Sequence, residues 1–111
     1  MTHVIYDPQE LCLTVSGHAG YGSYGHDLVC AALSVLCYTA EEALTKQWEL
    51  TCPTVDRSDG EYRISCQPED EASAGLCRAV MDTVFTGFRL LEEHYPEYVC
   101  ADILGGEWRN E

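Results

Sequence analysis

Residues 17–37, GHAGYGSYGHDLVCAALSVLC, contain the change from strand to helix that decides the fold. Before this stretch, Leu11, Leu13 and Val15 alternate with polar or small residues, which is the pattern of a strand with one buried face. From Leu28 onward the apolar residues recur every three or four positions, and this period predicts an amphipathic helix. Its buried stripe consists of Val29, Ala32, Leu33, Leu36, Ala40, Ala43 and Leu44.

The same helix carries a neighbouring stripe made of Cys30, Ser34, Cys37 and Glu41. Asp27 comes just before the apolar period and is a good N-cap residue, so we expect the helix to begin there. His18 continues the even-numbered series of Cys12, Thr14 and Ser16, which forms the polar face of the preceding strand. We therefore expect it at the end of that strand, pointing away from the core.

The rest of the chain adds three strands and a second helix to this unit. Segment 3–6 forms a strand that is joined to 11–17 through the turn residues Asp7 and Pro8. Segments 48–55 and 61–67 flank Asp59-Gly60, which is a strong hairpin signal. Within the first of these two segments, Pro53 indicates an edge strand or a bulge.

A second helix is expected to open at 68–71, because its acidic residues suit the positive end of a helix dipole. Its apolar stripe consists of Leu76, Val80, Val84, Phe88 and Leu91. Segment 98–104 closes the chain as a strand. The order β-β-α-β-β-α-β predicts one α/β (α+β) domain over residues 1–111, a two-layer sandwich with two helices on one face of a mixed sheet.

Composition limits the location and the partners of the chain. We expect a cytoplasmic protein, since the N-terminus lacks the basic and apolar regions of a secretory signal. We also expect no membrane partner, since no window reads as long or apolar enough to cross a bilayer. A net charge of −13, from 19 acidic and 6 basic residues, repels nucleic acid and anionic lipid. The same charge attracts a basic partner, although it could equally serve solubility alone.

Seven cysteines do not read as a disulfide framework here, because their number is odd and no export signal is present. No C-x-x-C pair occurs, so neither a zinc ribbon nor a thioredoxin-type pair has its usual spacing. We expect most of these thiols to be small core residues. A metal site formed by His18, His26 and Cys30 has no recognised spacing, and we expect neither a metal nor another cofactor.

Cys30 is the exception among the cysteines, because its expected place is two or three residues into a helix. Unpaired amides and the helix dipole at that position would stabilise a thiolate, and the same amides could form an oxyanion hole. An imidazole nearby could ionise with the thiol and later protonate a leaving amine. His18 is the candidate for this role, and His26 is the competing base.

The segment between His18 and the helix contains three glycines in eight residues, which permit unusual backbone angles and motion. It reads either as a lid over the substrate or as an ordinary connection. Its residues are Ala19, Gly20, Tyr21, Gly22, Ser23, Tyr24, Gly25 and His26. Asp27 could orient the ring of His18 or only cap the helix, and both roles stay open.

The stretch from Gly17 to Leu36 closely resembles the signature of the bacterial ribosomal-processing cysteine protease family, Prp. The resemblance rests on GHA at 17–19, a glycine-containing loop, DLVCAALSVL at 27–36, and twelve residues from His18 to Cys30. It implies that His18 is the general base and acid, that Cys30 is the nucleophile and that 19–26 form a mobile loop. It also matches Ser34, which could line the site.

The resemblance further implies a substrate and an assembly state. The substrate would be the short N-terminal extension of a large-subunit ribosomal protein, cut after a hydrophobic or aromatic residue by a homodimer. Two alternatives stay open from the sequence. One is a non-enzymatic factor that binds a ribosomal protein or an assembly intermediate. The other is a redox-sensing protein in which Cys37 would be a resolving thiol for Cys30.

Overall fold

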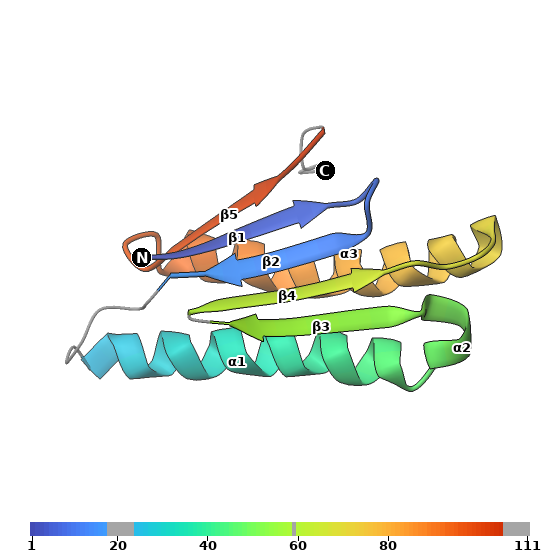
Figure 1. The fold of residues 1–111 in the computed structure, drawn as a ribbon. Coiled ribbons are helices and arrows are strands. Elements are labelled where there is room, and N and C mark those ends of the chain that lie inside the picture. Colours follow the sequence, from blue (N-terminus) through green and yellow to red (C-terminus); the bar gives the residue numbers. More distant parts are fainter. Residues whose placement is uncertain (18–23, 59, 106–111) are drawn as a thin grey trace.

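The computed structural model describes residues 1–17, 24–58 and 60–105, with the backbone alone described for 24–27. Strands and helices follow one another along the chain as shown in Figure 1. The elements are β1 (Thr2–Asp7), β2 (Cys12–Ser16), α1 (Tyr24–Thr45), α2 (Trp48–Thr51), β3 (Pro53–Ser58), β4 (Glu61–Cys66), α3 (Glu71–His94) and β5 (Val99–Ile103).

The five strands form one mixed sheet in the order β3-β4-β2-β1-β5. The β1–β5 pair is parallel, and the other three pairs are antiparallel. The long helices α1 and α3 pack together and cover one face of this sheet, and no helix of the described residues lies on its other face (Figure 1). The predicted two-layer sandwich with a mixed sheet is therefore confirmed, with the short helix α2 added to it.

The core lies between the helices and the covered face of the sheet. From the strands it takes Val4, Tyr6, Leu13 and Ile64, each of which is fully buried. From α1 it takes the predicted stripe, whose members are all buried or half-buried. On α3 the buried row is Cys77, Met81, Val84, Phe85 and Phe88, whereas the predicted members Leu76, Val80 and Leu91 are only half-buried.

The expected strand 48–55 is wrong in its first half, because residues 48–51 form α2. Thr51 is buried there and its hydroxyl donates to the Leu44 carbonyl oxygen at 2.8 Å. Cys52 then takes a left-handed conformation with φ 46° and ends the helix, so the strand begins only at Pro53. Trp48, the first residue of α2, is 62% exposed.

The hairpin prediction is confirmed, since β3 and β4 pair on either side of Asp59-Gly60 and Gly60 has φ +75°. The edge prediction for Pro53 is also confirmed, because β3 is the outer strand of the sheet. Gly17, which follows the last residue of β2 and donates its amide to the Gly60 carbonyl, has φ +98°. A Cβ atom at this position would lie 2.5 Å from the carbonyl oxygen of Met1, so only glycine fits.

The expectation that no segment could cross a membrane is wrong for α1. Its segment Leu28–Thr45 is long and apolar enough when judged by length and composition alone. In the fold, however, this helix packs its apolar stripe into the core, and a core helix passes the same test. The segment is therefore weak evidence for a membrane span.

Candidate active site

A groove with a volume of about 540 Å³ opens at one end of the sandwich, between α1 and the strands. Its helix side is lined by Cys30, Leu33, Ser34, Cys37 and Tyr38. Its strand side includes Val15, Gly17, Arg57, Ser58 and Tyr62. The groove thus brings the predicted nucleophile Cys30 and the predicted lining residue Ser34 together on one wall.

The helical period explains how α1 places these side chains. Cys30, Ser34 and Cys37 follow one another at intervals of four and three residues, so they share one face of the helix. This face lies beside the buried stripe, at the boundary between the core and the solvent. Cys30 is accordingly half-buried and Ser34 exposed, while Cys37 is buried.

The proposed link between Cys30 and the helix N-terminus is wrong. Helix α1 begins at Tyr24, so Cys30 is its seventh residue and lies about 9 Å along the axis from the first one. The amides without a helical acceptor belong to the first four residues of a helix, a turn before Cys30. Neither thiolate stabilisation nor an oxyanion hole can therefore be derived from the end of this helix.

The start of α1 at Tyr24 also corrects two predictions about residues 19–27. Asp27 is not an N-cap, since it is the fourth residue of α1, and residues 24–26 are helical and not part of a loop. The orienting role of Asp27 stays a prediction, because its side chain is not described. His18 and residues 19–23 lie outside the described residues, and so does the side chain of His26.

A polar network ties the hairpin to the helix beside the groove. The Tyr62 hydroxyl lies 3.1 Å from Oε1 of Glu41 and donates to the carbonyl oxygen of Cys37 at 3.2 Å. Arg57 forms an ion pair with the same Glu41 oxygen, and its guanidinium lies 5.6 Å from the centre of the Tyr62 ring. Because one carboxylate holds both side chains, the strand wall of the groove is fixed to α1.

The network and the core also set the protonation of nearby groups. Burial raises the pKa of the Cys37 thiol to about 11, with a further contribution from Glu41 that Arg57 partly offsets. Burial, followed by the charge and hydrogen bond of Glu41, raises the pKa of Tyr62 above its usual range. Both groups are therefore neutral near pH 7, and Cys37 is a poor candidate for a resolving thiol.

The apolar spacing and the motif predict the helix wall of the groove, but no prediction covers Arg57 and Tyr62 in its strand wall. Glu41 was placed correctly in the stripe of Cys30, while Arg57 and Tyr62 were not singled out. The hairpin signal at Asp59-Gly60 could have found them, since a two-residue turn makes them cross-strand partners. Among the residues that the structure describes, no group of three or more His, Cys, Asp or Glu side chains could hold a metal ion.

A cysteine in the wall of an open groove is placed where the nucleophile of a thiol-dependent hydrolase would meet its substrate. The comparisons with known proteins give the same class. The family model of the cysteine protease Prp matches residues 2–100, so the chain belongs to this family. It is accordingly a cysteine protease.

Curated relatives and solved structures support this assignment. The ribosomal processing cysteine proteases Prp of Staphylococcus aureus strains Mu50 and NCTC 8325 are each 28% identical over 86 residues, or 77% of this chain and 78% of theirs. A crystal structure from Streptococcus mutans has 28% identity and a TM-score of 0.67, covering 92% of this chain and 90% of that one.

The S. aureus Prp structure in complex with a substrate peptide has the same fold, with a TM-score of 0.75 at 21% identity. A second S. aureus structure, with a covalently linked product peptide, has a TM-score of 0.75 at 23% identity. Each alignment covers 93% of this chain and 99% of the other.

Proposed function

We propose that this chain removes the short N-terminal extension of a bacterial large-subunit ribosomal protein, cutting after a hydrophobic or aromatic residue. The observation that carries the proposal is the groove, in which Cys30 and Ser34 line one wall. Membership of the Prp family and the names of the S. aureus relatives support the substrate class.

In the proposed reaction Cys30 is the nucleophile and His18 the general base and acid. The sulfur bonds to the carbonyl carbon of the scissile peptide bond, and its proton passes to the imidazole. Collapse of the tetrahedral intermediate breaks the C–N bond, and the imidazolium gives the proton to the leaving amine. Water then cleaves the thioester, which releases the extension and regenerates the thiol.

The composition of the groove supports a preference for an apolar side chain. Val15 and Leu33 line it with the rings of Tyr38 and Tyr62, and Gly17 adds no side-chain bulk. An aromatic side chain of the substrate can bury its surface against these groups, with ring–ring contacts adding about 1 kcal/mol.

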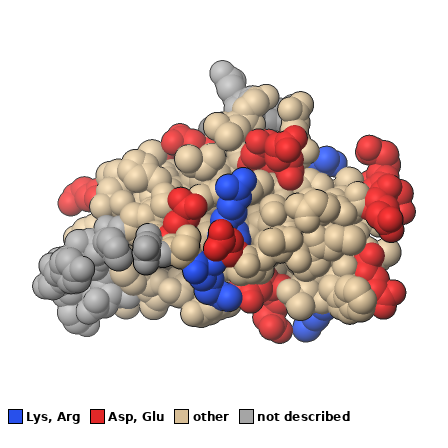
Figure 2. All heavy atoms as spheres, in the orientation of Figure 1, with Lys and Arg blue, Asp and Glu red and all other residues tan. Residues whose placement is uncertain are grey.

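The surface charge supports a basic substrate. Figure 2 shows acidic side chains around most of the outline of the visible face, with some of the few basic ones near its middle. A net charge of −13 would speed the encounter with a basic protein at low salt. A cleavage rate that stays constant from low to high salt would contradict this part of the proposal.

The decisive test is mass spectrometry of the ribosomal protein precursor after incubation with the unmodified chain and with the Cys30→Ala variant. We expect a single truncation after a hydrophobic or aromatic residue, absent in the variant. A substrate that stays intact in both samples would instead favour a binding or assembly factor. The homodimer and the cytoplasmic location stay predictions, which sedimentation and cell fractionation would test.

A further inference from the structure

The two edges of the sheet differ in how their backbone groups are used. The Leu104 amide donates to the Tyr6 carbonyl, so the backbone groups of even-numbered residues on β5 point toward β1. Backbone groups alternate in direction along a strand, and those of Val99 and Ala101 therefore point away from the sheet. The Val99 amide donates to the Tyr95 carbonyl at 3.1 Å, and the Ala101 amide donates to Glu92 Oε2 at 3.2 Å.

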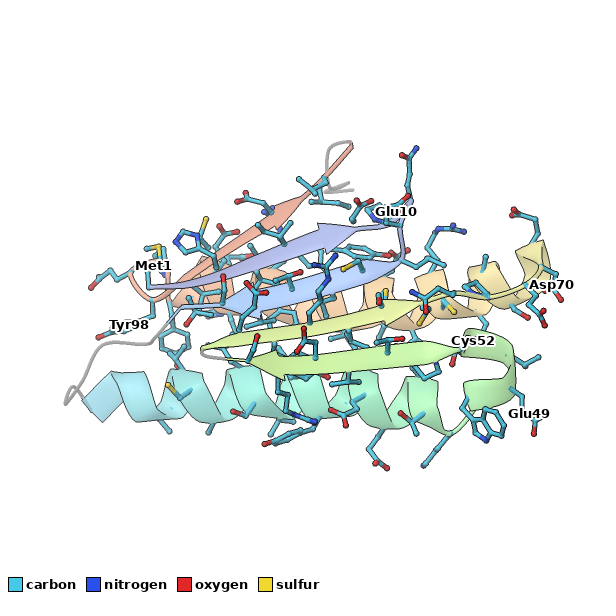
Figure 3. The ribbon with its side chains drawn as sticks, in the orientation of Figure 1. Met1, Glu10, Glu49, Cys52, Asp70 and Tyr98 are labelled. Atoms are coloured by element: carbon cyan, nitrogen blue, oxygen red, sulfur yellow. The ribbon has the colours of Figure 1, made fainter. Side chains whose placement is uncertain are left out.

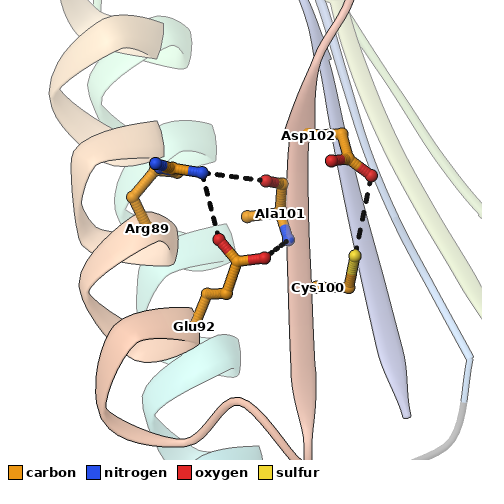
Figure 4. A network of polar contacts seen from close by, with 5 residues as sticks. All are labelled: Arg89, Glu92, Cys100, Ala101 and Asp102. Atoms are coloured by element: carbon orange, nitrogen blue, oxygen red, sulfur yellow. Dashed lines mark hydrogen bonds and ion pairs between the residues drawn. The ribbon is translucent and has the colours of Figure 1, made fainter. Parts of the chain in front are cut away.

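The other outward group of Ala101 is also occupied. Arg89 donates to its carbonyl oxygen at 3.5 Å and forms an ion pair with Glu92 at 3.1 Å, as Figure 4 shows. One pair of side chains from α3 therefore occupies both the amide and the carbonyl of Ala101. At Ala101 the edge is therefore covered and does not accept a further strand.

The direction of the backbone groups on β3 follows from the ladder of β4. The Cys66 amide donates to the Leu11 carbonyl at 3.0 Å, and the next amide, of Gln67, donates to the Cys52 carbonyl at 3.2 Å. Even residues of β4 thus bond toward β2 and odd residues toward β3. With the register Asp56↔Arg63, the groups of Val55 and Arg57 must point away from the sheet.

These outward groups form an open edge. Within residues 1–17, 24–58 and 60–105, no hydrogen bond involves the backbone amides or carbonyls of Val55 and Arg57. Pro53 has the same parity and carries no amide, which suits an outer position. Val55 and Arg57 therefore present two amides and two carbonyls at a spacing of about 7 Å, the repeat that an added strand matches.

This edge leads directly into the groove. Arg57 and Ser58 belong to β3 and also line the groove that contains Cys30. The side chain of Arg57 is held by Glu41, and its ion pair turns it toward α1. A chain that pairs with β3 would thus enter the groove at Arg57 in an extended conformation, with alternate side chains directed toward α1.

We propose that the substrate binds as an additional strand on β3, through the backbone groups of Val55 and Arg57. This inference rests on the proposed function and adds how the peptide is held. Main-chain bonds would bind the extended segment regardless of its sequence, while the apolar part of the groove, at Val15 and Leu33, selects one side chain. The extension therefore needs an unstructured, strand-compatible stretch beside the cleaved bond, not only a suitable residue at that bond.

The first test uses substrate peptides that each carry one N-methylated amide, scanned along the sequence. Affinity is measured with the Cys30→Ala variant, and kcat and KM with the unmodified chain. Strand addition predicts a weakening at every second position, by about 3- to 10-fold for each lost bond. A uniform effect, or none, would overturn the proposal.

The second test uses Val55→Pro, which removes the backbone amide that would donate a hydrogen bond to the substrate. We expect KM to rise by about 3- to 10-fold while kcat stays within about twofold, since one bond to the substrate is lost. The matched control is Ile103→Pro, which places a proline at an outward-facing position of the β5 edge and should leave KM unchanged. Urea unfolding of both variants verifies the fold, and the peptide scan decides if Val55→Pro does not fold.

The outcomes separate this inference from the proposed function. If the unmethylated peptide is cleaved but the effect of N-methylation shows no two-residue period, strand addition is rejected and the proposed protease function stands. If the loss of affinity on N-methylation has a two-residue period but the unmodified chain cleaves no peptide, strand addition stands and the proposed function is rejected. If Val55→Pro instead converts a dimer into a monomer in sedimentation, with KM unchanged, the edge pairs two copies and the inference is wrong.

Discussion

Cysteines occur at both ends of the sandwich, and at each end one of them, Cys30 or Cys52, is half-buried and lines a groove while others are buried in the core. Cys30 lies in the wall of the candidate active site. At the opposite end, where Figure 3 shows Cys52 and Asp70 far from Met1 and Tyr98, Cys66 and Cys77 are 3% and 0% exposed. Burial, aided by the neighbouring thiols, raises the pKa of Cys66 to about 12.

The difference shows what a cysteine needs before it can do chemistry. A buried sulfur that stays protonated acts as a small apolar side chain and a weak donor, as Cys77 does toward the Thr51 carbonyl at 4.0 Å. A nucleophile needs contact with the substrate and a base. Burial therefore separates the sulfurs of Cys66 and Cys77, which stabilise the fold, from the sulfur of Cys30, which is placed to react.

The largest effect expected from this comparison is on catalysis. Cys30→Ala should reduce kcat/KM for the precursor peptide by about 10⁴-fold or more, because the nucleophile is lost. Its urea midpoint should change little, since the side chain is half-buried at the surface of α1. Cleavage is measured by mass spectrometry and unfolding by circular dichroism.

The matched control is Cys77→Ala at the other end. It should keep kcat/KM and lose on the order of 1 kcal/mol of stability, because it leaves a small cavity in a full core. Activity lost with Cys77→Ala, or kept with Cys30→Ala, would break the comparison.

The sequence predicted those features that depend on local pattern. The stripe on α1 follows from apolar spacing, and the β3–β4 hairpin follows from Asp59-Gly60, because both are set by short-range geometry. Ser34 was found through the motif alone, whereas Cys30 was also singled out by an expected place at the helix start that proved wrong. Their place in one groove agrees with that reading, whereas their chemical roles rest on the proposal.

The features that were missed depend on tertiary packing. Gly25 has a low helix propensity, yet α1 extends past it to Tyr24, so the expected boundary at Asp27 was too late. On α3 the apolar surface is broad, and contact with the sheet selects Cys77 and Met81 over Leu76 and Val80. The approach of Arg57 to Glu41 depends on how the sheet lies across α1, which no local pattern contains.

Cys37 sharpens the comparison, because it lines the groove and yet is buried. Its pKa is about 11 in the folded chain, against an ordinary value of 9.0. The folded state thus holds the proton more tightly, so this stabilisation is complete below pH 9 and is lost as pH rises through 11.

We expect the free energy of unfolding to fall by roughly 2 to 3 kcal/mol more in the unmodified chain than in Cys37→Ala as pH rises over that window. Urea titrations at several alkaline pH values measure this difference. If the free energies of unfolding of the two proteins fell in parallel with pH, folding would not hold the proton on the Cys37 thiol. Burial would then not distinguish Cys37 from Cys30.

Two tyrosines test whether the polar network serves the groove or only the fold. Tyr62→Phe removes the hydroxyl between Cys37 and Glu41, so the strand wall should loosen. We expect a KM increase of about 3- to 10-fold with kcat nearly unchanged, and a stability loss of about 1 kcal/mol.

The control is Tyr6→Phe, since the Tyr6 hydroxyl donates to Asp82 at 2.5 Å on α3, away from the groove. It should lower stability by a similar amount and leave KM unchanged. Equal KM changes in both variants would assign the effect to global softening and not to the wall of the groove.

The smallest effect is expected at the far end, where Asp70 caps α3 by accepting from the Ser73 amide at 2.8 Å. This hydrogen bond lowers the pKa of Asp70, so its stabilisation is present above the usual value of 3.8 and is lost as pH falls through the folded pKa. Asp70→Ala should lower the urea midpoint slightly at pH 7 and converge with the unmodified chain in acid.

Asp70→Asn separates the cap from its charge. The amide oxygen of asparagine can still accept from Ser73, so the variant should keep most of the midpoint and lose its dependence on acid. Neither variant should alter cleavage, because this cap and the groove lie at opposite ends of the sheet. A change in KM with Asp70→Ala would show that stability at one end is coupled to substrate binding at the other, and the separation of the two ends would then fail.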